Sequence, residues 1–156
     1  MKETRCRKVD GLAVNAPVEQ VFSFWSDYQN FPHFMRHVRH VRVQGEESSW
    51  IVDGPAGVPV EWRSRVTHRI PDSLVAWHST AESAVKHEGS VRFDHNGNGG
   101  TRVTVRICYR PPAGALGHAL ATVFGTDPKT EMDDDLMRMK SMIETGHAPH
   151  DAAQPA

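Results

Sequence analysis

The chain has 156 residues, of which 38% are hydrophobic and 24% are charged, and its formal net charge at pH 7 is −1. This length is enough for one domain that buries its own core without metal ions or disulfides. The near-neutral charge gives no signature of DNA binding. No apolar run approaches the roughly 20 residues that cross a bilayer, and Met1–Arg7 is too polar for the apolar part of a secretory signal. We therefore expect a cytoplasmic protein.

Two cysteines, Cys6 and Cys108, lie in segments with strand-like patterns. Two cysteines are too few for a disulfide scaffold, and they do not form a Cys-x-x-Cys pair. We therefore expect two reduced and partly buried thiols.

The beginning of the chain predicts one strand followed by short helices. Thr4–Val14 can form the strand, and Asn15-Ala16-Pro17 is typical of a helix start. One buried helical face then follows at helical spacing: Val18, Val21, Phe22 and Trp25. Asp27–Asn30 ends this helix, and a second short helix is expected before Phe31-Pro32.

Six strand-like runs come next, most of them with apolar residues at alternate positions. The runs are Phe34–Glu46, Ser48–Asp53, Val58–Ile70, Leu74–Thr80, Ala84–His95 and Thr101–Arg110. In the first run, alternation places Val41 and Val43 on one side, and in the third it places Ser64 and His68 on the apolar side. One apolar and one charged face predict an antiparallel sheet that is covered on one side.

The longest helical stretch, Ala113–Gly146, follows the last strand directly, with a break at Gly125–Pro128. Its two apolar stripes are Leu116, Ala119, Leu120 and Val123, then Met132, Leu136, Met139 and Ile143. We expect Asp133–Asp135 to form a solvated helix face, and residues 147–156 to be a disordered tail after a single domain of residues 1–146. A long amphipathic helix after a meander of strands can bury its stripe only across the sheet.

Five segments carry a resemblance to a known family: Ala16–Phe22, Phe31–Met35, Val60–Trp62, Gly100–Val103 and Tyr109–Gly114. Together with the order of elements, they resemble the polyketide cyclase/dehydrase and lipid-transport family, whose superfamily includes coenzyme Q-binding proteins. The resemblance implies an α+β helix-grip fold. In this fold a curved antiparallel sheet of about seven strands wraps around a long C-terminal helix, and two short helices follow the first strand.

Members of that family include polyketide aromatases/cyclases, quinone or lipid binders, and proteins that contact ribosomes. We expect a hydrophobic small molecule, such as a polyketide, quinone or lipid, between the apolar sheet face and the last helix, with no cofactor. The candidate lining residues are Phe31, Phe34, Met35, Trp62, Ser64, His87, Phe93, Tyr109, Leu120 and Phe124. Each aromatic residue taken alone is more commonly plain core.

Two alternatives stay open. The first is a cyclase/dehydratase with His87, His68 and Tyr109 as candidate catalytic residues, although these side chains can equally bond neighbouring backbone groups. The second is a module that docks on a ribosome or membrane through the charged sheet face: Arg63, Arg65, Arg69, Lys86, Arg92, Arg102, Arg106 and Arg110. We prefer cross-strand ion pairs on a solvated surface as the explanation of that face. The ten histidines have no zinc-like spacing, so we expect no metal site. The sequence assigns no oligomeric state.

Overall fold

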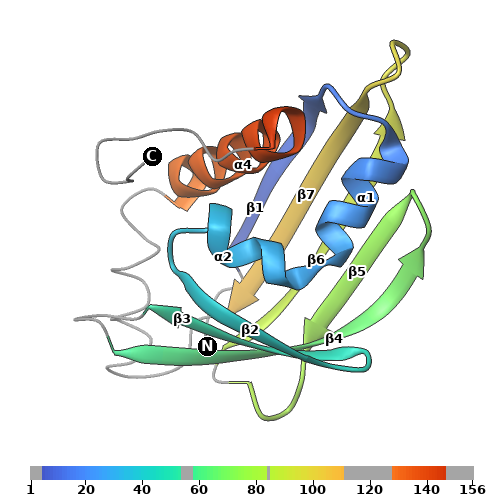
Figure 1. Ribbon diagram of the computed structural model, residues 1–156. Coiled ribbons are helices and arrows are strands. Elements are labelled where there is room, and N and C mark those ends of the chain that lie inside the picture. Colours follow the sequence, from blue (N-terminus) through green and yellow to red (C-terminus); the bar gives the residue numbers. More distant parts are fainter. Residues whose placement is uncertain (1–4, 54–57, 84, 111–127, 147–156) are drawn as a thin grey trace.

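Seven antiparallel strands form one curved sheet, and helices lie on its concave side (Figure 1). The computed structural model describes residues 5–53, 58–83, 85–110 and 128–146. The elements in chain order are β1 (Arg5–Val14), α1 (Val18–Ser26), the 3₁₀ turn η1 (Tyr28–Asn30), α2 (Phe31–Phe34), β2 (Val38–Gln44), β3 (Glu47–Asp53), β4 (Pro59–Ile70), β5 (Leu74–Ser79), β6 (Lys86–His95), β7 (Thr101–Arg110) and α4 (Pro128–Thr145).

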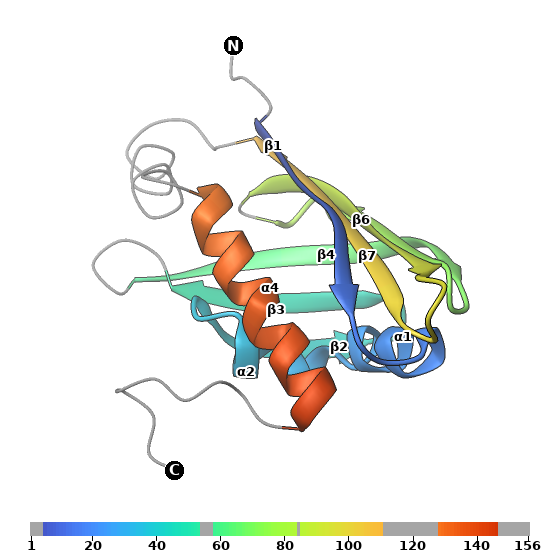
Figure 2. The ribbon, with the colours of Figure 1, turned by 90° about the horizontal axis from the view of Figure 1, so that it is seen from above.

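The strand order across the sheet is β1-β7-β6-β5-β4-β3-β2, so the first strand pairs with the last one. All other neighbours are consecutive in the chain, as in a meander. The sheet bends strongly, so that β2, β3 and β4 cross beneath the upright strands and face α1, α2 and α4 (Figures 1 and 2). This arrangement confirms the α+β helix-grip fold that the sequence predicts.

The described part of the C-terminal helix, α4, buries one side against the sheet. Leu136, Met139 and Ile143 are at most 7% exposed, as their spacing predicts. The helix ends at Gly146, whose φ of +79° suits glycine and whose N–H donates to the Met142 carbonyl at 2.8 Å. Residues 113–127 of the predicted helix and the expected tail at 147–156 lie outside the described residues. In the part of the chain that the structure describes, no helix is both long and apolar enough to span a membrane.

The start of the second predicted strand differs from the expectation. Phe34 ends α2, where the Met35 N–H still donates to the Phe31 carbonyl, and β2 begins only at Val38. A register shift between Val38 and His40 then changes which residues face inward. Val41 and Val43 lie beyond this shift and keep the common side that alternation predicts, opposite Trp50 and Ser48 of β3. Val41 is buried, whereas Val43, near the end of this edge strand, is 45% exposed.

A second irregularity moves His68 out of the concave face. The register between β4 and β5 shifts between Val66 and His68, which interrupts the alternation of β4. His68 is exposed, and its Nδ1 lies 3.1 Å from the Thr67 hydroxyl. The prediction that His68 lies on the covered face is wrong because a bulge inverts residue parity from that point onward.

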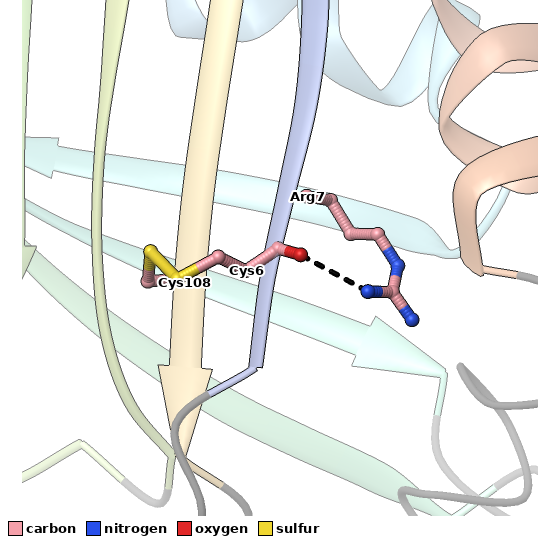
Figure 3. The surroundings of a disulfide bond; sticks show 3 residues. All are labelled: Cys6, Arg7 and Cys108. Carbon is pink, nitrogen blue, oxygen red and sulfur yellow. Dashed lines mark hydrogen bonds between the residues drawn. A yellow bond between two sulfur atoms is a disulfide. The ribbon is translucent and has the colours of Figure 1, made fainter.

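The prediction of two reduced thiols is also wrong. Cys6 of β1 and Cys108 of β7 are direct partners in the strand register and form a disulfide (Figure 3). They are separated by 102 residues in sequence. Their proximity depends on the pairing of the first strand with the last, which local patterns do not reveal.

Loss of this disulfide should lower stability, because the cross-link restricts a long segment of the unfolded chain. We expect the Cys6→Ala/Cys108→Ala variant to lose about 2–4 kcal/mol of unfolding free energy, measured by urea denaturation. Adding a reducing agent should destabilise the native protein similarly and leave the double variant unchanged. Two titratable thiols in the folded, non-reduced protein would contradict the disulfide.

Candidate functional site

A cavity of about 240 Å³ lies on the concave side of the sheet. Every helix and strand that the structure describes contributes at least one residue to its wall. Most of this wall is apolar side chain, and the polar groups within it are few. Concave apolar surfaces with a few polar groups are typical of small-molecule sites.

All four tryptophans of the chain lie in the wall of this one cavity. They come from α1, β3, β4 and β5: Trp25, Trp50, Trp62 and Trp77. Phe31 of α2 joins two of them, with ring centroids 5.3 Å from Trp25 and 5.0 Å from Trp50 and nearly perpendicular ring planes. Such edge-to-face contacts hold large flat surfaces in defined orientations.

A glycine in β6 makes room for one of these indoles. Gly89 is the register partner of Trp77, and a Cβ atom built on Gly89 would lie 2.5 Å from Cζ2 of the indole. The same Cβ would lie 2.9 Å from the Arg106 carbonyl oxygen, so backbone and side chain both crowd this position. The missing side chain therefore lets the Trp77 ring lie close to the sheet and sets the depth of the cavity there.

The structure brings most of the predicted lining residues together. Those in the cavity wall are Phe31, Phe34, Met35, Trp62, Ser64, His87 and Tyr109. Phe93 is instead packed in the core, 2% exposed, with its ring centroid 5.4 Å from that of Phe22. His68 does not belong to the wall. Leu120 and Phe124 lie outside the described residues.

His87 places a neutral polar group in the aromatic wall. Its imidazole is stacked near Trp62, with ring centroids 4.8 Å apart, and the residue is 8% exposed. Burial lowers the pKa of His87 to about 4, although a hydrogen bond to the backbone of Arg63 acts in the opposite direction. Nε2 has no hydrogen-bond partner among the described residues. The ring is therefore uncharged at neutral pH and has one nitrogen available.

Arg7 of β1 places a cation in the same wall, which the sequence reasoning missed. Its Nη1 donates to the Cys6 carbonyl at 3.0 Å, and its side chain leaves the strand on the side away from the disulfide (Figure 3). Its buried Nε has no partner among the described residues. The alternation of β1 contained the signal, since it places Arg7 on the side of Val9 and opposite Cys6 and Lys8.

A buried carboxylate on α4 corrects the expectation for the acidic run Asp133–Asp135. Asp134 is exposed as expected, but Asp135 is 6% exposed and belongs to the cavity wall. Burial raises the pKa of Asp135, and its ion pair with Arg138 opposes that rise. Arg138 Nε also donates to the Phe34 carbonyl at 3.1 Å, so this pair connects α4 to α2.

The charged face of the sheet carries ion pairs between neighbouring strands. Arg65 Nη1 of β4 lies 2.8 Å from Glu47 Oε2 of β3. The prediction that Arg69 lies on this face is wrong, because Arg69 follows the register shift in β4, is opposite Val75 of the cavity wall, and pairs with Glu46 at 2.9 Å. The Arg65–Glu47 pair fits a solvated surface, while docking on a ribosome or membrane stays a prediction. Among the described residues, no group of three histidine, cysteine or acidic side chains is arranged to hold a metal ion.

The neutral state of buried His87 should make stability depend on pH. Its pKa is about 4 in the folded protein and near 6.5 when unfolded, so the unfolded state binds more protons between these values. The contribution of neutral His87 to the unfolding free energy is fully present above about pH 6.5, and it is lost as the pH falls toward 4. We expect the unfolding free energy to fall by roughly 1–3 kcal/mol more in the native protein than in His87→Gln between pH 7 and 4.5. His68→Gln, at an exposed position, is the control and should follow the native curve; parallel curves for native protein and His87→Gln would contradict the assignment.

Comparison with known proteins places this geometry in a family. Residues 14–137 match the family model described as polyketide cyclase / dehydrase and lipid transport. An uncharacterised 17.2 kDa protein from the melC2-rnhH intergenic region of Streptomyces lincolnensis is 27% identical over 137 residues, which are 86% of this chain and 87% of that protein.

Solved structures have the same fold. The structure of DR_A0006 from Deinococcus radiodurans is 30% identical, with a TM-score of 0.69 over 93% of this chain and 100% of that chain. The Zhui aromatase/cyclase from Streptomyces sp. R1128 is 15% identical, also with a TM-score of 0.69, over 94% of this chain and 100% of that chain. Since the family model covers most of its length, the chain belongs to the polyketide cyclase/dehydrase and lipid-transport family.

Proposed function

We propose that this protein binds a hydrophobic small molecule, such as a polyketide, quinone or lipid fragment, in the cavity on the concave side of the sheet. The observation that carries the proposal is the convergence of all four tryptophans on that cavity from four separate elements. Four indoles in a plain core would pack against one another and against aliphatic residues. Here each indole packs partly against other side chains and also borders the cavity, and an apolar molecule that fills the cavity removes the remaining indole surface from water.

The volume of the cavity limits the size of the ligand. Sites for drug-sized molecules usually enclose roughly 300–1,000 Å³, whereas this one encloses about 240 Å³. A compact molecule of about two fused rings, or a medium-length acyl chain, suits that volume. The flat, rigid indole surfaces favour the planar ligand, because stacking on them costs little conformational entropy.

Tryptophan fluorescence tests the proposal directly, because every indole in the chain borders the site. We expect saturable changes in emission on titration with 2-naphthol or menadione. Gly89→Ala should weaken this binding at least tenfold, because the added methyl group displaces the Trp77 ring, and should cost about 1–3 kcal/mol of stability. Ser90→Thr, which adds a methyl group at the next position of β6, is the matched control. Absence of saturable binding in the native protein would reject the proposal.

A cyclase/dehydratase activity is the second candidate, and two observations favour it. The Zhui aromatase/cyclase has a similar fold, and His87 is the register partner of Tyr109, so an imidazole and a phenol are neighbours in the cavity wall. Neighbouring groups of this kind can move protons during enolisation and dehydration. However, a histidine with a pKa of about 4 is a weak base at neutral pH, so binding is the better-supported function.

Turnover measurements separate the two functions. If the protein is a cyclase, His87→Gln should lower kcat for cyclisation of a linear polyketone thioester about 10²-fold, while binding of 2-naphthol is retained. His68→Gln should match the native rate. No aromatic product from the native protein would leave binding as the function.

The expected cytoplasmic location stays a prediction. The Cys6–Cys108 disulfide bears on it, because disulfides persist mainly in oxidising compartments. Fractionation of the producing cell together with thiol labelling distinguishes a reduced cytoplasmic form from an oxidised one.

A further inference from the structure

Arg7 has a charge that the described residues of the cavity do not balance. Its side chain belongs to the wall, its Nε is buried, and Nη1 donates to the Cys6 carbonyl, the one hydrogen-bond acceptor of Arg7 among the described residues. No carboxylate among the described residues forms an ion pair with Arg7. A partly buried cation of this kind is costly unless a negative group accompanies it.

The nearby acidic groups are engaged elsewhere. Asp135 is the one carboxylate among the described residues of the wall, and it pairs with Arg138 and, at 3.7 Å, with Arg36. Asp10, on the same strand as Arg7, pairs with Lys8 at 3.8 Å, and its side chain is 77% exposed. The guanidinium therefore keeps donors for a partner that enters the cavity.

We propose that the ligand of this cavity is an apolar molecule with one carboxylate, or a comparably acidic oxygen, and that Arg7 binds that anionic group. The inference rests on the proposed function, since it specifies the chemistry of the bound molecule. A carboxylate can accept two parallel N–H bonds from a guanidinium, and bonds between charged groups are roughly twice as strong as neutral ones.

The strand register positions a second polar contact for such a ligand. Arg7 is opposite Ile107 in β7, and Tyr109 lies two residues farther along the same face. Tyr109 is in turn opposite His87 in β6. Arg7 and His87 thus lie on either side of β7, two strand spacings apart across the sheet and two residues apart along it, which separates their backbones by roughly 12 Å. A bicyclic acid spans that distance, with its acidic group at Arg7 and a hydrogen-bonding group at His87 Nε2.

Matched ligands that differ only in charge test the proposal. We would titrate native protein with 2-naphthoate against 2-naphthamide, and with decanoate against decanamide, following tryptophan emission. We expect each acid to bind at least tenfold more tightly than its amide. The naphthalene pair represents planar ligands and the decanoyl pair represents acyl chains, so their relative affinities identify the preferred skeleton.

Substitutions locate the charge preference. Arg7→Met should weaken binding of the acids 10- to 100-fold and change binding of the amides less than about threefold, since it removes a charge-assisted pair. Lys8→Met removes the same charge from the next residue of β1, outside the cavity wall, and should change neither. Should Arg7→Met fail to fold by circular dichroism, Arg7→Lys keeps the charge without the bidentate geometry and should retain a reduced preference for acids.

The outcomes separate this inference from the proposed function. Equal binding of acids and amides by native protein, or an acid preference that survives in folded Arg7→Met, overturns the role of Arg7 while small-molecule binding stands. If Arg7→Lys is the variant studied, the role of Arg7 in binding the acidic group is also overturned when that variant loses binding of both the acids and the amides. Failure of all four ligands to bind overturns both proposals together.

Discussion

The pairing of β1 with β7 is the constraint on which the rest of the molecule depends. Among the described strands it is the one pairing between elements that are not consecutive, and a disulfide fixes its register. Further bonds connect the same ends: the Thr101 hydroxyl donates to the Ala16 carbonyl at 2.8 Å, and the Asn15 N–H donates to Glu144 of α4 at 2.7 Å. Contacts between residues far apart in the sequence form slowly, because the conformational entropy of the intervening chain is lost before the contacts can stabilise the fold. Once formed, they hold the N-terminal strand, the last strand and the C-terminal helix around one interior.

That interior has two parts, a packed aromatic core and the cavity. On one side, Phe22, Trp25 and Phe93 make edge-to-face contacts that bring α1 onto β6. On the other side the aromatic rings border the cavity, on the concave side of the curved sheet (Figure 2). Irregularities in the strands accompany the bend: the register shifts in β1, β2 and β4, and Gly11 in the β1 shift has a φ of +67°. Bulges increase local twist and bend a strand, so they help the sheet curve far enough to leave room.

Local sequence patterns predicted the elements well and the individual inward positions less well. Alternation and helical spacing identify every strand and the buried side of α4, because these signals depend only on neighbouring residues. The same parity rule fails at His68, since a one-residue bulge reverses it and leaves no clear mark in the sequence. Parity also does not predict that Val43 is exposed, because that depends on its place near the end of an edge strand. The disulfide escaped because register between the first and last strands is a property of the whole sheet. Arg7 and Asp135 escaped for a different reason: charged residues are normally assigned to solvent, and only the assembled cavity shows that these two line its wall.

Gly89 shows how much of a binding site can belong to the backbone. The space that Trp77 occupies exists because one residue of β6 has no side chain. The volume of the cavity therefore depends on a residue that lies behind the Trp77 ring and that need not contact the ligand. Exchanging the residue at such a position changes the room available without altering the chemistry of the surface that a ligand meets. Proteins with this fold can therefore differ in the size of the ligand that they bind, while the fold and the side chains that line the cavity stay nearly the same.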